Sequence, residues 1–181
     1  VEFHSKMNAI GGDTVAMLAA GVAEASRNFE ALVVGNDADA FSAGANLMLV
    51  LLEAQEENWD EIDLMGRTFQ SAVIGLRYAD IPVVVAPAGL TLGGGSEIAL
   101  HGDRVQAAVE TYMGQAELGV GLIPAGGGTK ELLSRHVDQV PSGVADTLPY
   151  IQHVFELIGF GTISTSGPDA RRLGLLRDVD S

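Results

Sequence analysis

Gly93-Gly94-Gly95-Ser96-Glu97-Ile98-Ala99-Leu100 stands shortly after a strongly apolar run, I-P-V-V-V-A-P-A at positions 81–88. The apolar run predicts a buried strand that is entered through a proline at its first positions. The three glycines predict a tight turn, and the residues from Ser96 to Leu100 predict a helix that begins there. A strand followed closely by a helix is typical of the α/β class.

The same alternation of strands and helices extends in both directions along the chain. On the amino-terminal side we predict a strand end at 1–4, a turn and helix within 7–28, a strand at 31–34, a small-residue loop at 41–46, and one or two amphipathic helices within 53–78. On the carboxyl-terminal side we predict a strand at 105–108, a loop at 112–121, a helix from 126–129 to about 136, and helices at 150–158 and 168–173, the last with Ser166 as N-cap and Gly174 as C-cap. The sequence therefore predicts an α/β fold.

Length and composition predict a single domain over residues 1–181. Hydrophobic residues make up 47% of the chain and charged residues 19%, which excludes a disordered tail. The formal net charge of -14 argues against nucleic-acid binding, although a few backbone amides and cations suffice to hold a phosphate-bearing cofactor. The chain has no cysteine, which excludes disulfides and thiolate metal sites.

No apolar run of the sequence reaches the length of a membrane span, and no signal peptide opens it. We therefore expect a cytoplasmic protein without a membrane span. Because the chain starts with Val1 rather than Met, we also expect it to be a fragment of a longer polypeptide.

Two glycine-bearing turns are candidates for ligand binding: Ala43-Gly44-Ala45 and Gly93-Gly94-Gly95. Small residues let a ligand approach the main chain, and the second turn adds the positive end of a helix dipole. Brought together, the two turns would form an oxyanion hole for a thioester carbonyl that becomes an enolate. The alternative, for each glycine run taken by itself, is a tight strand-to-helix connection.

Two carboxylates lie close to these glycines in the sequence. Glu97 is just inside the helix that follows Gly93–Gly95, and Glu117 lies in a glycine-rich apolar segment. Two carboxylates near one pocket can divide acid and base roles if their environments differ. The alternative is that Glu97 only complements the helix N-terminus and that Glu117 is a solvated loop residue.

Other patterns do not complete a site. Glu97 and His101 have the i, i+4 spacing of helical metal ligands, but no third ligand is apparent, so we predict a structural or solvated histidine and no metal. Ser96 lacks the trailing glycine of a nucleophile elbow. No G-x-G-x-x-G follows a strand, so no nicotinamide-binding fingerprint is present in this sequence.

The order and spacing of these segments resemble those of the crotonase, or enoyl-CoA hydratase/isomerase, superfamily. The resemblance runs from Lys6-Met7-Asn8-Ala9 to about Arg135, with a weaker echo at 170–175. Its most specific parts are F-S-A-G-A-N at 41–46, G-G-G-S-E-I-A-L at 93–100 and M-G-Q-A-E-L-G-V-G-L-I-P-A-G-G-G-T at 113–129. The resemblance implies a ClpP-like spiral of ββα units, with a core over 1–136 and a helical tail over 137–181, assembled as a homo-trimer or hexamer.

The resemblance also implies catalytic roles for four residues. Ala45 and Gly94 would supply the two oxyanion-hole amides, and Glu97 and Glu117 would be the two glutamates of a hydratase. The implied reaction is the hydration of 2-enoyl-CoA thioesters in fatty-acid β-oxidation. Coenzyme A is then part of the substrate, and no cofactor is bound covalently.

The coenzyme A and acyl subsites are likewise implied by the resemblance. Ala43, together with the turn that holds Lys6, Asn8 and Ala9, would lie near the adenine and ribose-phosphate end of coenzyme A. Leu47 and its neighbours on the following helix would line the acyl pocket.

The chain departs from the family pattern at three places. Asn46 stands where many hydratases have Asp, 136–165 forms an extra segment, and the usual carboxyl-terminal helical extension is shortened or missing. The long helix after Asn46, this extra segment and the start without Met resemble the hydratase part of a fused 3-hydroxyacyl-CoA dehydrogenase/enoyl-CoA hydratase. Three alternatives stay open: an enoyl-CoA isomerase, a thioester hydrolase, and a non-catalytic coenzyme A-binding domain.

Overall fold

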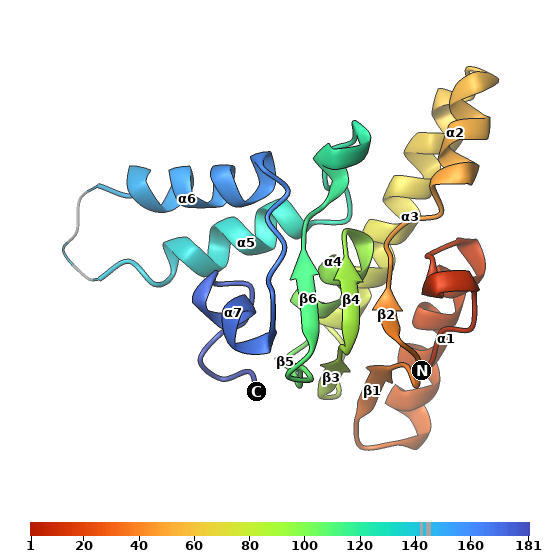
Figure 1. Cartoon of the computed structure of the whole chain (residues 1–181). Coiled ribbons are helices and arrows are strands. Elements are labelled where there is room, and N and C mark those ends of the chain that lie inside the picture. Colours follow the sequence, from red (N-terminus) through yellow and green to blue (C-terminus); the bar gives the residue numbers. More distant parts are fainter. Residues whose placement is uncertain (142, 144–145) are drawn as a thin grey trace.

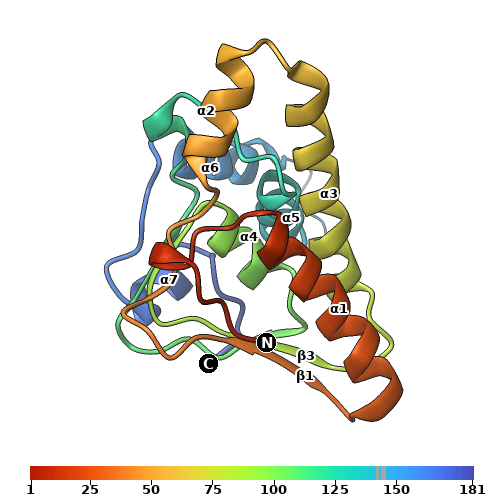
Figure 2. The same cartoon turned by 90° about the vertical axis from the view of Figure 1, so that its right-hand side faces the viewer.

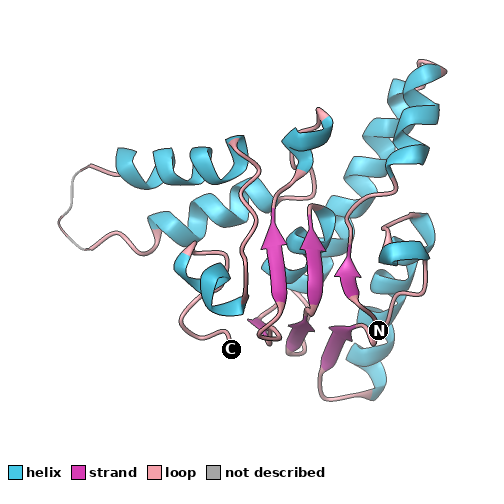
Figure 3. Cartoon of the chain, in the orientation of Figure 1, coloured by secondary structure: helices cyan, strands magenta, loops and turns pink. Residues whose placement is uncertain are grey.

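Two three-stranded parallel sheets form the centre of the molecule, and helices lie on both sides of them (Figure 1, Figure 3). The computed structural model describes residues 1–141, 143 and 146–181. One sheet has the strand order β1-β3-β5 and the other β2-β4-β6. The strands are β1 (Leu32–Gly35), β2 (Ala40–Ser42), β3 (Val83–Ala86), β4 (Gly89–Leu92), β5 (Arg104–Val105) and β6 (Thr111–Gly114).

Consecutive strands alternate between the two sheets, and a helix follows each pair. Each turn of the chain therefore adds one strand to each sheet and one helical segment. This confirms the α/β class and the spiral of ββα units.

The helices between and around the strands follow the apolar pattern of the sequence. Helices α1 and α3 run side by side, while α2 and the start of α3 form a hairpin that projects from the body of the molecule (Figure 1, Figure 2). The helical segments are η1 (Lys6–Asn8), α1 (Gly12–Asn28), α2 (Leu47–Gln55), α3 (Trp59–Arg77), α4 (Gly94–Leu100), η2 (Glu117–Val120), α5 (Gly128–Val137), α6 (Leu148–Gly159) and α7 (Gly167–Arg172).

Several predicted strands and loops are wrong in detail. The small-residue loop predicted at 41–46 begins inside β2, and the loop predicted at 112–121 contains most of β6 and all of η2. The strand predicted at 105–108 is cut to β5, because Ala107 donates its N–H to the carbonyl of Ser181 instead of continuing the ladder. The segment 1–4 is not a strand, although Val1 hydrogen bonds with Val33 and Gly35 beside β1.

The last 45 residues contribute to the same hydrophobic core as the strands, insofar as the structure describes them. Val154 and Leu157 of α6 and Ala170 of α7 are buried together with Val85 and Met113 of the sheets. Ser166 accepts a hydrogen bond from Asp169 N–H at 3.2 Å, which confirms it as the N-cap of α7. Part of the predicted extra segment 136–165, namely residues 142 and 144–145, lies outside the described residues.

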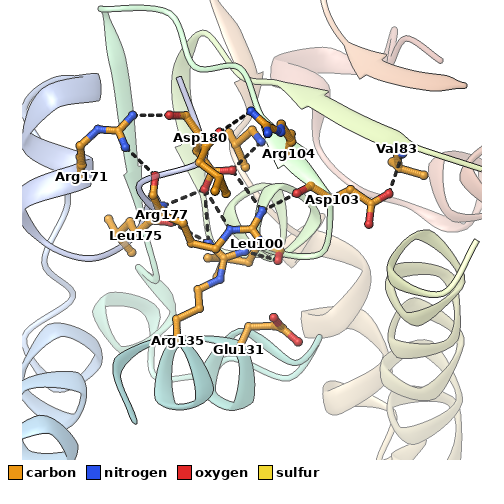
Figure 4. A network of polar contacts seen from close by, with 12 residues as sticks. Val83, Leu100, Asp103, Arg104, Glu131, Arg135, Arg171, Leu175, Arg177 and Asp180 are labelled. Carbon is orange, nitrogen blue, oxygen red and sulfur yellow. Dashed lines mark hydrogen bonds and ion pairs between the residues drawn. The ribbon is translucent and has the colours of Figure 1, made fainter. Parts of the chain in front are cut away.

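A buried ionic network ties the end of the chain to α4 and α5 (Figure 4). Arg135 of α5 donates to the carbonyls of Leu100 and Leu175, and its guanidinium lies 4.0 Å from the carboxylate of Asp180. Asp180 also accepts hydrogen bonds from Val105 N–H at 3.0 Å and Arg177 N–H at 2.7 Å. Burial lowers the pKa of Arg135 to about 10, so it stays charged at neutral pH.

The ionisation of Asp180 is set by two opposing effects. Burial favours the neutral carboxyl, but the hydrogen bonds from Arg177 and Val105 outweigh it and hold the pKa of Asp180 below its ordinary value.

Among the described residues, no helix is long and apolar enough to cross a membrane.

We predict that Asp180→Asn destabilises the fold by about 3–5 kcal/mol, because it leaves the buried Arg135 without its counter-charge. Since the folded pKa of Asp180 is depressed, its stabilising effect is present above the unfolded pKa and is lost as the pH falls through the folded pKa. Chemical denaturation at a series of pH values should therefore show a difference between wild type and variant that shrinks in acid. Asp63→Asn, which removes the exposed partner of Arg67, is the control and should have little effect.

Candidate active site

The two glycine turns meet at the carboxyl ends of β2 and β4, which are parallel neighbours. Gly44 has φ +94°, and a methyl group built on it would lie 3.0 Å from the Leu92 carbonyl oxygen and 3.6 Å from Gly94 N. A methyl group on Gly95 would lie 2.7 Å from Cβ of Ser42. The main chains of the two turns therefore pack directly against each other, and glycine is required on both sides.

The two amides predicted to form the oxyanion hole belong to these turns. Gly94 is the first residue of α4, so its N–H has no partner within the helix. Ala45 is exposed and forms an isolated parallel β-bridge with Ile10. The hydrogen bonds of this bridge run from Ile10 N–H to the Gly44 carbonyl and from Asn46 N–H to the Ile10 carbonyl, so they do not use the Ala45 amide. In the described part of the chain, neither N–H donates to another protein group.

Glu97 is buried on α4, one turn beyond these amides. Its Oε1 accepts a hydrogen bond of 2.8 Å from Gly128 N–H, the first amide of α5. Burial raises the pKa of Glu97 above its ordinary value, and the hydrogen bonds from Gly128 and Gly126 only partly offset this effect. The alternative, that Glu97 only complements the N-terminus of α4, does not account for its burial or for the hydrogen bond that it accepts from Gly128 of α5.

Glu117 begins η2, and its carboxylate lies against Gly93. A methyl group built on Gly93, which has φ +50°, would come within 2.8 Å of Glu117 Oε1. Burial, followed by repulsion from Glu97, raises the pKa of Glu117 to about 7. Glu117 is therefore not a freely solvated loop residue, and a pKa of about 7 means that its carboxyl group titrates close to neutral pH.

Two groups near these carboxylates had not been singled out in the sequence. Gln115 is buried, and one orientation of its amide satisfies both ends: the NH₂ group donates to the Glu117 carboxylate at 3.2 Å, and the oxygen accepts from Ser96 Oγ at 3.3 Å. The second group is the Gly128 amide that anchors Glu97. The sequence contained a pattern that could have indicated Gln115: it lies two residues before Glu117 and two after Met113, so alternation along a strand places it on the same inward face as Met113.

The residues predicted to bind coenzyme A lie on two connected segments. Ala43 N–H donates to the carbonyl of Met7 at 3.1 Å, which joins Ala43 to the turn formed by Lys6–Ala9. Lys6 and Ala43 are exposed and Ala9 is half-buried. Asn8 is buried, and its side chain donates to the Ala40 carbonyl at 2.8 Å, so it supports the turn rather than offering its amide to a ligand.

Leu47 is the first residue of α2 and is exposed. The residue before it, Asn46, caps this helix by accepting a hydrogen bond from Met48 N–H at 3.3 Å. The departure from Asp at this position therefore keeps a helix-capping side chain.

The described residues contain no group of three potential metal ligands from His, Asp or Glu. His101 is fully buried, and its Nδ1 lies 2.7 Å from the Glu97 carbonyl oxygen. Of the two roles that the sequence left open for it, structural or solvated, His101 thus has the structural one.

Residues 1–143 match the model of the enoyl-CoA hydratase/isomerase family, and the chain belongs to this family. Its structure is similar to that of an enoyl-CoA hydratase subunit I from Geobacillus kaustophilus HTA426, with a TM-score of 0.78 and 26% identity over 99% of this chain and 64% of that chain.

Two curated relatives carry different names. The chain is 44% identical over 180 residues to the "Probable 3-hydroxyacyl-CoA dehydrogenase" of Bacillus subtilis (strain 168), which covers 99% of this chain and 22% of that protein. It is 33% identical over 129 residues to the short-chain-enoyl-CoA hydratase of Clostridium acetobutylicum, covering 70% of this chain and 48% of that protein. The chain thus spans less than half the length of each of these relatives.

We predict that Glu97→Gln lowers the pKa of Glu117 from about 7, because it removes the carboxylate whose charge opposes ionisation of Glu117. The titration can be followed by NMR of the Glu117 side-chain carboxyl. Glu110→Gln, at an exposed position, should leave the pKa of Glu117 unchanged. An unchanged pKa in the Glu97 variant would mean that the two carboxylates do not interact electrostatically.

Proposed function

We propose that this chain is an enoyl-CoA hydratase that adds water to 2-enoyl-CoA thioesters in fatty-acid β-oxidation. The observation that carries the proposal is the arrangement of Glu97 and Glu117, both with raised pKa values, beside two glycine turns with unpaired amides in the described structure. The names of the Clostridium acetobutylicum and Geobacillus kaustophilus relatives support the same reaction.

The different environments of the two carboxylates suggest how the work is divided. Glu97 accepts a hydrogen bond from the first amide of α5, which favours its ionised form, so we assign it as the base that takes a proton from water. Glu117 has a pKa of about 7 and is substantially protonated at neutral pH, so we assign it as the acid. The hydroxide oxygen bonds to C3, the proton from Glu117 goes to C2, and proton exchange with solvent restores both groups.

Addition at C3 places negative charge on the thioester oxygen. We propose that the N–H groups of Ala45 and Gly94 donate hydrogen bonds to this oxygen and stabilise the enolate. One such donor typically contributes about 3–4 kcal/mol to lowering the barrier. The close packing of Gly44 against Gly94 supports this role, because it fixes the distance between the two amides before the substrate binds.

The remaining subsites and the assembly belong to the same proposal. Lys6, Ala9 and Ala43 would meet coenzyme A, with Asn8 holding their turn, and Leu47 would meet the acyl chain. The product, a 3-hydroxyacyl-CoA, is the substrate class in the name of the Bacillus subtilis relative, which supports a parent polypeptide that also contains a dehydrogenase. We further propose a homo-trimer or hexamer that works in the cytoplasm.

We predict that Glu97→Gln and Glu117→Gln each lower kcat/KM for crotonyl-CoA hydration by roughly 10²–10⁴-fold, because each removes one proton-transfer group. Loss of the enoyl-thioester absorbance measures the reaction. Glu110→Gln, which is remote from the glycine turns, serves as the control and should keep wild-type activity. Full hydration by both active-site variants would refute the proposal.

A parallel assay with a 3-enoyl-CoA separates hydratase from isomerase. Moving a double bond requires one group to carry a proton between two carbons, whereas hydration uses two. Isomerisation without hydration, abolished in only one of the two Glu variants, would identify the chain as an isomerase.

A further inference from the structure

His101 contacts both structural elements that hold Glu97. It caps the carboxyl end of α4, where Nδ1 lies 2.7 Å from the Glu97 carbonyl oxygen. A carbonyl oxygen can only accept, so Nδ1 carries the proton and donates it. The imidazole is fully buried, and burial lowers the pKa of His101, which favours the neutral ring with an unprotonated Nε2.

The other edge of the imidazole packs against the first turn of α5. A methyl group built on Gly127 would lie 3.1 Å from both Nε2 and Cε1 of His101. Gly127 has φ +107° and is the N-cap of α5, so its conformation determines where the next amide, that of Gly128, points. That amide donates to the Glu97 carboxylate.

Charged groups close the space behind the ring. Nε2 lies 3.9 Å from Oε1 of Glu131, which itself contacts Lys130 Nζ at 2.8 Å, while Arg77 lies 3.8 Å from its other oxygen. Within the described part of the chain, Nε2 makes no hydrogen bond. Its position is therefore determined by packing and by the single bond from Nδ1.

We propose that His101 is a positioning residue, which orients the Glu97 carboxylate by holding α4 and the Gly127–Gly128 turn in register. The inference rests on the proposed role of Glu97 in hydration. His101 would touch neither substrate nor reacting atoms. It would act through the Glu97 main chain on one side and through the Gly128 amide on the other.

The chain offers a matched control in His136. This residue is also buried on a helix, its Nδ1 lies 2.8 Å from the carbonyl of Leu132 four residues earlier, and its ring packs against a glycine of positive φ, Gly174. It lies near the opposite end of α5 from Gly128. Replacing either histidine removes the same kind of bond, but only one of them adjoins Glu97.

We predict that His101→Leu lowers kcat for crotonyl-CoA by on the order of ten-fold or more, because the carboxylate loses its productive orientation, while KM changes little. The Gly128 amide proton should shift upfield in the NMR spectrum as its bond to Glu97 weakens. His101→Asn, whose amide N–H replaces Nδ1–H, should restore much of both signals. His136→Leu should alter neither, even if it lowers the thermal stability equally.

The NMR signal separates this inference from the proposed function. If the wild type does not hydrate crotonyl-CoA, the hydratase proposal fails, yet the Gly128 resonance still reports whether His101 orients the carboxylate. An unchanged Gly128 resonance in His101→Leu, or equal effects of His101→Leu and His136→Leu on kcat and on that resonance, would overturn the inference. Should His101→Leu not fold, His101→Met provides the same test with a flexible side chain.

Discussion

The absence of side chains at Gly44 and Gly95 is the constraint on which the candidate site depends. Parallel pairing of β2 and β4 brings the ends of two strands together, but only bare main chain can pack as closely as the two turns do there. The first amide of α4 and the amide of Ala45 lie on these two turns, and in the described part of the chain neither donates to another protein group. Hydrogen-bond donors are thus oriented by the fold itself, before any ligand contributes binding energy.

Close packing also determines the electrostatics of the two glutamates. A carboxylate removed from water favours its neutral form, and a second carboxylate nearby strengthens this preference. Glu97 is partly relieved by the first amide of α5, whereas Glu117 retains the larger effect and titrates near neutral pH. Two residues of the same type therefore acquire different chemical properties because different helices surround them.

The sequence predicted the class of fold, the glycine turns and the two glutamates, because these depend on local patterns. β-branched runs in β1 and β3 and the glycine-to-helix transition at α4 are visible within short windows. Strands β2, β4 and β6, which form the other sheet, were missed because none of them contains a run of β-branched residues and each pairs with strands distant in the sequence. The Gly128 amide and Gln115 were missed for a similar reason: their contacts join segments 31 and 19 residues apart. Local periodicity carries no information on which helix terminus will meet which carboxylate.

None of the residues of helix α2 is buried, even though leucine and valine dominate it. A nine-residue helix with no buried residue gains little from its own hydrogen bonds, and its local unfolding costs little free energy. Its backbone amides should therefore exchange with deuterium well before those of α4, which is buried throughout. In the proposed enzyme, the segment that begins at Leu47 is consequently the part that can change shape at the lowest free-energy cost around acyl groups of different size, while the polar end beside α4 stays rigid.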